Sequence, residues 1–268
     1  MTTPLTDDYP YAVAEVAAGE LRQRWGLDHV FAGIVLGSGW GPAAETWGEP
    51  LHETSMADVS GFVPPIAPGH AGRILHYRWS GRDVLVLSGR THFFEGHGTA
   101  AVVHGVRMLA ALGVRRLIVT NANGSFRPQW PLGQIVALTD HLNLSWVSPL
   151  VGARFVDLTD AYDPALRARA LQIDPTLVTG VYAMFPGPHY ETAAEAKMAA
   201  TMGADVVGMS TVLEVIAARE FDMKVLALSI VTAHEASGEI IDPDEVVAVA
   251  QASARRTSGL LKAIIESD

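Results

Sequence analysis

The stretch DVLVLSGRTHFFEGH, residues 83–97, decides the fold and points to the function. Its first part, Asp83–Ser88, is a short apolar run typical of a buried strand. Arg90, His92 and Glu95 follow just past the carboxyl end of that strand. Open α/β sheets bind ligands at this edge because strand ends and helix amino termini converge there. Since a guanidinium beside an imidazole suits an oxyanion, we expect a seat for phosphate or a phosphate-like substrate.

Strand-like and helical patterns alternate on both sides of this stretch. Apolar runs predict further strands at Phe31–Leu36, Arg116–Thr120, Asp205–Met209 and Lys224–Val231. Helical patterns cover Ala12–Trp25, Thr99–Leu112 and Glu191–Met202. The segment Thr211–Glu214 matches a capping box that opens another helix. A last helix runs to about Glu266, with Asp242 as its cap, Pro243 at its first position and Glu245 three residues after the cap.

The alternation and the composition together predict one α/β domain over residues 1–268. The near-continuous apolar strands are typical of a sheet buried on both faces. We therefore expect a central mixed, mostly parallel sheet flanked by helices. Apolar residues make up 49% of the 268, enough for a large core, and no linker divides the chain.

Charge and residue usage exclude several classes of partner. A formal net charge of −10 without a basic stripe argues against nucleic acid and anionic membranes. The absence of cysteine excludes disulfides, thiol nucleophiles and cysteine metal sites. The amino terminus lacks a secretory pattern and no apolar run reaches spanning length, so we expect a cytoplasmic protein.

Three glycine-containing turns are candidate ligand contacts. Gly37–Gly41 follows a strand and could present backbone N–H groups and the Ser38 hydroxyl, but taken alone an ordinary tight turn explains it better. Its spacing does not fit a dinucleotide fingerprint. Gly69–Arg73 could clamp an anion through His70, or be a solvated turn. Thr120–Ser125 is predicted as a junction from strand to turn that permits backbone contact with a ligand.

Two later motifs could hold a flat ring. In Gly187–Thr192, Tyr190 could stack on a ring or sugar face and Glu191 could accept hydrogen bonds from ring N–H groups. The alternative is that Glu191 only favours a helix amino terminus. In Val207–Thr211, Met209 could line a ring pocket, although a lone methionine beside a strand is more often core. No metal site is predicted, since the ten histidines include no zinc-binding pair on a helix.

In this order the motifs strongly resemble the trimeric class of purine nucleoside phosphorylases, over roughly residues 30 to 250. The resembling segments are Gly37–Gly39, Pro68–Arg73, Gly89–His92 with Glu95 and Gly96, Thr120–Ala122, Gly187–Pro188, Tyr190–Thr192, Val207–Thr211 and Thr232. The resemblance implies cleavage of the N-glycosidic bond of a purine nucleoside by inorganic phosphate. The products would be the free base and (deoxy)ribose 1-phosphate, formed without a cofactor or metal, in purine salvage, by a homotrimer.

The resemblance also implies roles for individual residues. Phosphate would bind Ser38, His70, Arg90, His92, the backbone at Ala122, and Ser210. The nucleoside would contact Phe94, Tyr190, Glu191, Val207, Gly208, Met209, Thr232 and Ala233, with Glu191 on the N1–H side of a 6-oxopurine such as hypoxanthine or guanine. The expected catalytic residues are His92, Glu95, Thr232 and His234.

Two departures from the family pattern stand out. In its 6-oxopurine members an asparagine follows the threonine that matches Thr232 and donates to the departing purine near N7, whereas this chain has Ala233. Losing one such donor typically costs about 10²–10³ in rate. Our hypothesis is that His234, Glu235 or Asn123 takes over the contact. The second departure is Pro243, which aligns with a family histidine that contacts the ribose 5′-hydroxyl.

Two other functions therefore remain open at the level of sequence. The first is phosphorolysis of methylthioadenosine or another modified nucleoside, which Ala233 and Pro243 favour and Glu191 opposes. The second is a binding protein that recognises purine and phosphate with little catalysis. The segment Arg154–Tyr162 lies where such enzymes build subunit contacts.

Overall fold

Nine strands and the helices around them make up the described chain, which is residues 9–235 and 243–267 of a computed structural model. The strands are β1 (Ala32–Leu36), β2 (His52–Ser55), β3 (Arg73–Trp79), β4 (Arg82–Ser88), β5 (Arg116–Ser125), β6 (Ile135–Asn143), β7 (Val178–Met184), β8 (Val206–Gly208) and β9 (Lys224–His234). The helices are α1 (Tyr9–Trp25), α2 (Gly41–Glu45), α3 (Gly98–Val102), α4 (His104–Ala111), α5 (Pro164–Ile173), α6 (Ala193–Thr201), α7 (Val212–Glu220) and α8 (Pro243–Glu266), with 3₁₀ turns at Met56–Asp58 and Phe93–Glu95.

The strands form one mixed sheet in the order β2-β3-β4-β1-β5-β8-β7-β6-β9. Strands β4, β1, β5 and β9 are parallel to one another, so their carboxyl ends meet at one edge. Strand β5 pairs with both β8 and β9, and β6 joins β7 to β9, so five strands close into a ring. The predicted α/β class with a mixed sheet is confirmed.

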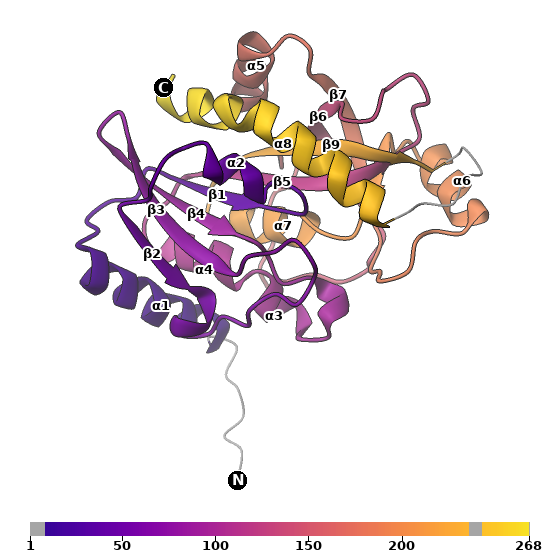
Figure 1. Ribbon diagram of the computed structural model, residues 1–268. Helices are drawn as coiled ribbons and strands as arrows, with labels where there is room; N and C mark the ends of the chain where they lie inside the picture. Colours follow the sequence, from indigo (N-terminus) through magenta and orange to yellow (C-terminus); the bar gives the residue numbers. More distant parts are fainter. Residues whose placement is uncertain (1–8, 236–242, 268) are drawn as a thin grey trace.

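Helices cover both faces of the sheet (Figure 1). On one face α1, α4 and α7 pack in a cluster that includes Leu85 and Leu87 of β4. On the other face α2, α5 and α8 pack in a cluster that includes Val84 and Val86 of the same strand. Because neighbouring residues of a strand point to opposite faces, a strand covered on both sides must be apolar throughout. This explains the continuous run Asp83–Ser88 in the sequence.

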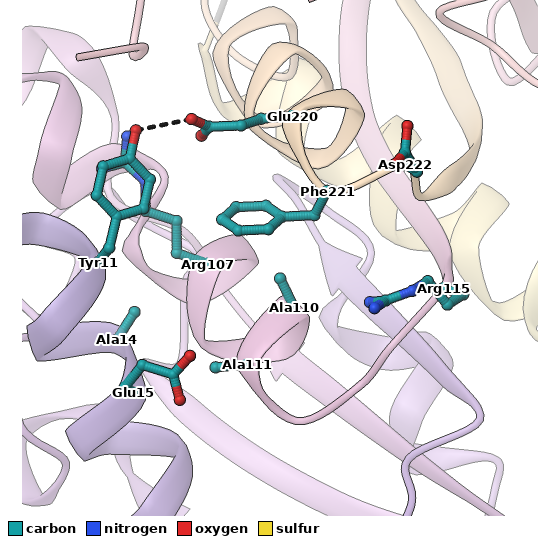
Figure 2. Close-up of a pocket in the computed structure, with 10 residues that line it drawn as sticks. All are labelled: Tyr11, Ala14, Glu15, Arg107, Ala110, Ala111, Arg115, Glu220, Phe221 and Asp222. Carbon is teal, nitrogen blue, oxygen red and sulfur yellow. Dashed lines mark hydrogen bonds between the residues drawn. The ribbon is translucent and has the colours of Figure 1, made fainter. Parts of the chain in front are cut away.

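A hollow lies between α1, α4 and the end of α7, three helices that cover the same face of the sheet (Figure 2). The Tyr11 hydroxyl donates to Glu220 at 2.7 Å, and the Arg107 guanidinium lies 4.5 Å from the centre of the Tyr11 ring. Arg107 also donates to the carbonyl of Pro149 at 2.7 Å. The lining includes no residue of the stretch 83–97, so this hollow is separate from the predicted ligand edge.

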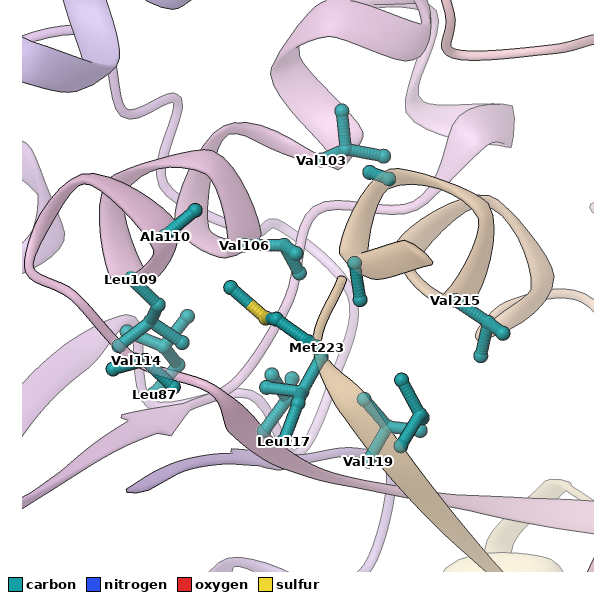
Figure 3. Packing of buried hydrophobic residues seen from close by; sticks show 14 of the residues in the cluster. Leu87, Val103, Val106, Leu109, Ala110, Val114, Leu117, Val119, Val215 and Met223 are labelled. Atoms are coloured by element: carbon teal, nitrogen blue, oxygen red, sulfur yellow. The ribbon is translucent and has the colours of Figure 1, made fainter. Parts of the chain in front are cut away.

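The larger core cluster joins α4 and α7 to the middle of the sheet. Figure 3 shows Met223, at the turn from α7 into β9, pointing between Val106 of α4 and Leu117 of β5. These three side chains are almost completely buried. Burial of this kind contributes about 1.5–3 kcal/mol for each large apolar side chain. The cluster thus fixes the parallel strands whose ends carry the predicted site.

Gly105 of α4 marks a close approach between this helix and β4. A Cβ added there would lie 2.5 Å from Cδ1 of Leu87. We expect Gly105→Ala to destabilise the protein by about 1–3 kcal/mol, because the extra methyl overpacks a filled core. Urea unfolding of the two proteins measures the difference.

The matched control is Gly19, a glycine inside α1 where an added Cβ meets nothing within 4 Å. Gly19→Ala is expected to stabilise by about 0.5–1 kcal/mol, because alanine has the higher helix propensity. If both substitutions shift the midpoint in the same direction, the close approach at Gly105 is not what limits packing there.

Several element boundaries differ from the prediction. The helix predicted at Thr99–Leu112 is two helices, α3 and α4, which meet at Val103. The helix predicted at Glu191–Met202 begins only at Ala193, because Thr192 and Glu195 form a capping box. Strands β2, β3, β6 and β7 and helix α5 were not predicted, because polar residues break up their apolar pattern. Helix α2 was not predicted because it has only five residues and begins in the glycine turn.

Two further predictions concern the end of the chain and the membrane. The predicted cap Asp242 lies outside the described residues, as do the side chains of Pro243 and Glu245, although α8 does begin at Pro243. Among the helices that the structure describes, none combines the length and the apolar character needed to span a bilayer.

Candidate active site at the carboxyl edge of the sheet

The parallel strands bring the predicted residues to one edge. Ser38 follows β1, Arg90 follows β4, Ala122 lies in the last part of β5 and Ala233 in the last part of β9. Ser38 and Ala122 are half-buried. The edge is therefore built from four segments far apart in the sequence, as expected for a ligand site in an α/β sheet.

Arg90 is the buried centre of this edge, with 4% of its surface exposed. Its Nη1 donates to the hydroxyls of Ser210 at 3.0 Å and Thr211 at 2.9 Å, and its Nη2 donates to the carbonyl of Thr120 at 2.6 Å. Nη1 also lies 3.2 Å from Oε2 of Glu214. These partners hold the guanidinium in one orientation, so its charge is in place before a ligand arrives.

The predicted capping box at Thr211–Glu214 is only half formed: α7 does begin after Thr211, and the Glu214 carboxylate accepts from the Thr211 backbone. Thr211 precedes α7 with φ of 75° and makes no side-chain capping bond. Its hydroxyl instead accepts from Arg90 and, at 2.8 Å, from Nδ2 of Asn121, while the Glu214 carboxylate pairs with Arg90. A β-branched residue at positive φ is strained, and such residues concentrate at functional sites. The pattern of a helix cap thus serves to hold an arginine.

His70 connects the first glycine turn to Arg90. Its Nδ1 accepts from the backbone N–H of Arg90 at 3.0 Å, and its Nε2 lies 3.0 Å from Oγ of Ser38. With Nδ1 as acceptor, Nε2 carries the proton and donates to Ser38. Burial, helped by the charges of His92 and Arg90, lowers the pKa of His70 to about 3. His70 is therefore neutral near pH 7 and leaves the Ser38 hydroxyl proton available to a ligand.

His92 is fixed by Glu95. The backbone N–H of His92 donates to Oε1 of Glu95 at 2.7 Å, and its Nδ1 lies 3.2 Å from the same oxygen. The other oxygen of Glu95 accepts from the N–H of Ile66 at 3.0 Å. Burial and the Arg90 charge lower the pKa of His92 to about 3. A neutral ring that donates through Nδ1 leaves Nε2 as an acceptor, so Glu95 orients His92.

A chain of buried polar side chains crosses from β5 to β9. Asn121 donates to Thr211, and Ser229 donates to Oδ1 of Asn121. Nδ2 of Asn123 donates in turn to Ser229 at 2.5 Å. The turn predicted at Asn121–Ser125 is therefore wrong, because β5 continues to Ser125. Its polar residues find partners inside the sheet and need no turn.

The pairing of β5 with β9 contains a bulge at Thr232. Asn123 lies opposite Val231, and the next residue of β5, Gly124, lies opposite Ala233. Thr232 is thus the extra residue, and its hydroxyl donates to the carbonyl of Asn123 at 3.0 Å. Bulges of this kind often redirect side chains near active sites. The strand continues to His234, three residues beyond the predicted end at Val231.

Glu191 lies in the loop before α6, and its Oε1 is buried with no hydrogen-bond partner among the described residues. Burial is the main cause of the raised pKa of its carboxyl. Thr192 and Glu195 cap the helix instead: the Thr192 N–H donates to Oε2 of Glu195 at 2.8 Å. The alternative role for Glu191, support of the helix terminus, is thus carried by another residue, and Glu191 keeps an acceptor to offer.

Phe94 and Met209 flank the loop that carries Glu191. A Cβ added at Gly187 would lie 2.5 Å from Sδ of Met209 and 3.1 Å from the Phe94 ring. The Phe94 ring also stacks on His92, with centres 4.7 Å apart. Tyr190 is 43% exposed in the same loop. Phe94 thus connects the loop that carries Glu191 to His92.

The remaining predicted residues have mainly structural contacts. Val207 is 2% exposed and packs in a small apolar cluster with Ala183. Gly208 lies against the Tyr182 hydroxyl. His234 follows Ala233 in β9 and is half-buried.

The sequence prediction missed Asn121 and Ser229 in the polar chain and the partnership of Glu214 with Arg90. Their signal is a buried polar residue within an apolar strand or helix, as for Ser229 in Lys224–Val231. Such a residue must have a partner, because an unpaired polar group in the core costs about 1–3 kcal/mol. The sequence does not say which partner it has.

Comparison with known proteins identifies the family of this chain. The model of the phosphorylase superfamily matches residues 32–266. The chain is 48% identical over 267 residues to a purine nucleoside phosphorylase of Mycobacterium tuberculosis, covering 99% of both chains. It is also 48% identical over 265 residues to one of Cellulomonas sp, covering 96% of this chain and 93% of the other.

A solved structure is similar over almost the whole fold. It is isoform 2 of purine nucleoside phosphorylase from Schistosoma mansoni in complex with cytosine and ribose-1-phosphate, which superimposes with a TM-score of 0.88 at 31% identity over 98% of both chains. The chain therefore belongs to the phosphorylase superfamily and, within it, to the purine nucleoside phosphorylases, which are pentosyltransferases.

Proposed function

We propose that this enzyme cleaves 6-oxopurine nucleosides, inosine and guanosine, with inorganic phosphate as the co-substrate and no metal or cofactor. The products are the free base and (deoxy)ribose 1-phosphate, and the expected setting is purine salvage in the cytoplasm. The observation that carries the proposal is the Arg90 cluster: a buried and oriented cation that contacts the Ser210 hydroxyl, with Ser38 linked through His70 to the Arg90 backbone. Such a set of donors suits a phosphate dianion.

The proposed phosphate seat uses each group in a defined protonation state. Arg90 and the hydroxyls of Ser38 and Ser210 donate to phosphate oxygens, together with the backbone at Ala122. Neutral His92 donates a hydrogen bond from Nδ1 to Glu95. Its Nε2 is then free to accept a hydrogen bond from the O–H of hydrogen phosphate. Held in this way, the phosphate lies where it stabilises the positive charge that develops on the sugar as the glycosidic bond breaks.

The preference for a 6-oxopurine rests on Glu191. Its unpartnered Oε1 is a buried acceptor, and hypoxanthine and guanine carry a proton on N1 that adenine lacks. A nucleoside that donates to this oxygen removes the cost of leaving it unpaired. Met209, Phe94 and Tyr190 supply the apolar surfaces for base and sugar.

A substrate panel tests the proposed function. Inosine, guanosine, adenosine, xanthosine and methylthioadenosine are each incubated with and without inorganic phosphate, and the free base is followed. We expect phosphate-dependent release from inosine and guanosine. Release only from methylthioadenosine transfers the assignment to the modified-nucleoside enzymes, and binding of guanine with phosphate but without turnover on any substrate makes the protein a binding homologue.

We also propose that the chain assembles as a homotrimer, as in the class that it resembles. Phe155 is 97% exposed and Trp146 is 83% exposed, and large apolar side chains in this position are typical of subunit contacts. Light scattering after size exclusion should give the mass of three chains. A monomer at micromolar concentration would contradict it.

A further inference from the structure

The resemblance to the 6-oxopurine enzymes implies a purine donor at the position of Ala233, which alanine cannot supply. The residues that follow, His234 at the end of β9 and Glu235 just after it, decide what can replace that donor. Residues two apart on a strand point to the same face, and neighbours to opposite faces. The backbone N–H of Glu235 donates to the carbonyl of Ser125 at 3.0 Å, so the pairing with β5 continues through this residue. Glu235 therefore shares the face of Ala233, and His234 points to the other.

The Glu235 carboxyl lies directly over Gly124, the residue of β5 that faces Ala233. A Cβ built on Gly124 would overlap Oε1 of Glu235. A glycine and an alanine facing each other thus leave a space above the strand pair, and the carboxyl of Glu235 occupies it. The Glu235 carboxyl therefore lies on the face of the strand pair that Gly124 and Ala233 share.

Glu191 acts on the same carboxyl from the loop before α6. Burial, with a contribution from the negative charge of Glu191, raises the pKa of Glu235 to about 7. Gly124 and Ala233 carry no charged group that would lower it, and Glu191 is the charged group whose effect on Glu235 is resolved. Two carboxyls that face one small site do not both ionise easily, so one of them keeps a proton near neutral pH.

Asn123, the third candidate from the sequence, is committed elsewhere. It is 3% exposed, and its Nδ2 donates to Ser229 at 2.5 Å within the sheet. As the neighbour of Gly124 on β5, it points to the opposite face. Of the three candidates His234, Glu235 and Asn123, only Glu235 thus lies on the same face as Ala233.

We propose that Glu235, as a neutral carboxylic acid, donates its proton to N7 of the departing purine and replaces the missing donor at Ala233. This inference rests on the proposed function. Glu191 and Glu235 then form a pair of carboxyls with separate tasks: Glu191 accepts from N1–H and Glu235 gives a proton to N7. Pairs in which the environment sets different protonation states are a recurrent way to run acid catalysis near pH 7.

The step balances without any further reactant. A phosphate oxygen forms a bond to C1′ as the bond from C1′ to N9 breaks, and the bonding pair passes into the purine ring. The proton of Glu235 moves to N7, so the base leaves neutral and Glu235 becomes a carboxylate. The monoprotonated phosphate ester then releases its proton to solvent, and Glu235 takes one up from solvent, so the net reaction transfers one proton from phosphate to the base.

The decisive measurement compares guanosine with 7-methylguanosine. The methylated base already carries a positive charge and leaves without a proton at N7. Glu235→Ala should lower kcat for guanosine by about 10²-fold, as for loss of one general acid, and change kcat for 7-methylguanosine less than about threefold. Retained turnover of 7-methylguanosine also shows that the variant is folded with its phosphate site intact.

Glu235→Gln separates donation from proton transfer. The amide keeps an N–H donor, so its loss on guanosine should be smaller than that of Glu235→Ala. The ratio of wild-type to Glu235→Gln kcat should fall as pH rises through about 7, because the wild type loses its proton there and the amide does not titrate. Taking the ratio cancels the titration of phosphate itself.

Restoring the family residue completes the test. Ala233→Asn in the Glu235→Ala background should recover at least tenfold of the lost kcat on guanosine. Equal losses on both substrates, a ratio independent of pH, or a guanosine-specific loss found in His234→Ala instead would each overturn the assignment to Glu235. If the wild type turns over neither nucleoside with phosphate, the proposed function itself fails, which is a different result.

Discussion

Arg90→Met should abolish nearly all phosphate-dependent turnover, lowering kcat/KM for phosphate by about 10³-fold. The wild-type guanidinium is oriented by Ser210, Thr211 and the Thr120 carbonyl, so in the proposed phosphate seat its charge acts on the dianion without reorganisation. Arg90→Lys should recover little, because a point charge on a flexible chain cannot use the planar set of partners. Initial rates against phosphate concentration at saturating nucleoside measure the effect.

The same substitution should also destabilise the fold, by about 3–5 kcal/mol, because it leaves the Glu214 carboxylate buried and unpaired. Glu214 is 2% exposed, and burial raises its pKa. The double variant Arg90→Met with Glu214→Met separates the two effects. We expect it to regain most of the stability while remaining inactive. Recovery of activity in the double variant would show that Arg90 acts only on the fold.

His92→Gln and His70→Gln should each make the protein less sensitive to acid. The pKa of both histidines falls from 6.5 to about 3 on folding, so the unfolded chain takes up their protons first as pH drops. Stability that is fully present above pH 6.5 is therefore lost below it, by roughly 2 kcal/mol for each histidine at pH 5. A glutamine does not titrate and removes that loss.

The measurement is urea unfolding of wild type and variants at pH 7.5 and pH 5. Between pH 7.5 and pH 5, the free energy of unfolding of the wild type should fall by about 2 kcal/mol more than that of either single variant. It should fall by about 4 kcal/mol more than that of the double variant His70→Gln with His92→Gln. His104→Gln is a comparison variant outside the site: burial also lowers the pKa of His104, so this variant too should lose less stability than the wild type at low pH. Equal losses in wild type and double variant would mean that the two histidines are protonated in the folded protein.

Periodicity predicted the parts of this fold in which hydrophobic burial dominates. Strand β4 could be predicted because both of its faces are covered, so that Asp83–Ser88 is apolar almost throughout. Strand β3 was missed because His76 and Arg78 interrupt its apolar residues, although His76 is buried against Asp83 at 2.9 Å. A local pattern cannot show a partner that only the neighbouring strand supplies.

The candidate site divides in the same way. Arg90 and His92 could be predicted from their place after a strand, where topology alone brings ligand residues together. The roles of Thr211 and Glu214 could not, because a helix cap and an arginine clamp use the same residue types at the same spacing. Only the positive φ of Thr211 and the direction of its hydroxyl distinguish the two.

The bulge at Thr232 makes chain length a determinant of what the purine meets. One extra residue in β9 exchanges the faces of all residues that follow it, so Val231 and Ala233 lie on opposite sides although they are two apart. A relative that gained or lost a single residue here would present the side chain now on the far side, with no substitution at all. If Glu235 is the leaving-group donor as proposed, a single insertion or deletion in this short segment is enough to exchange that donor.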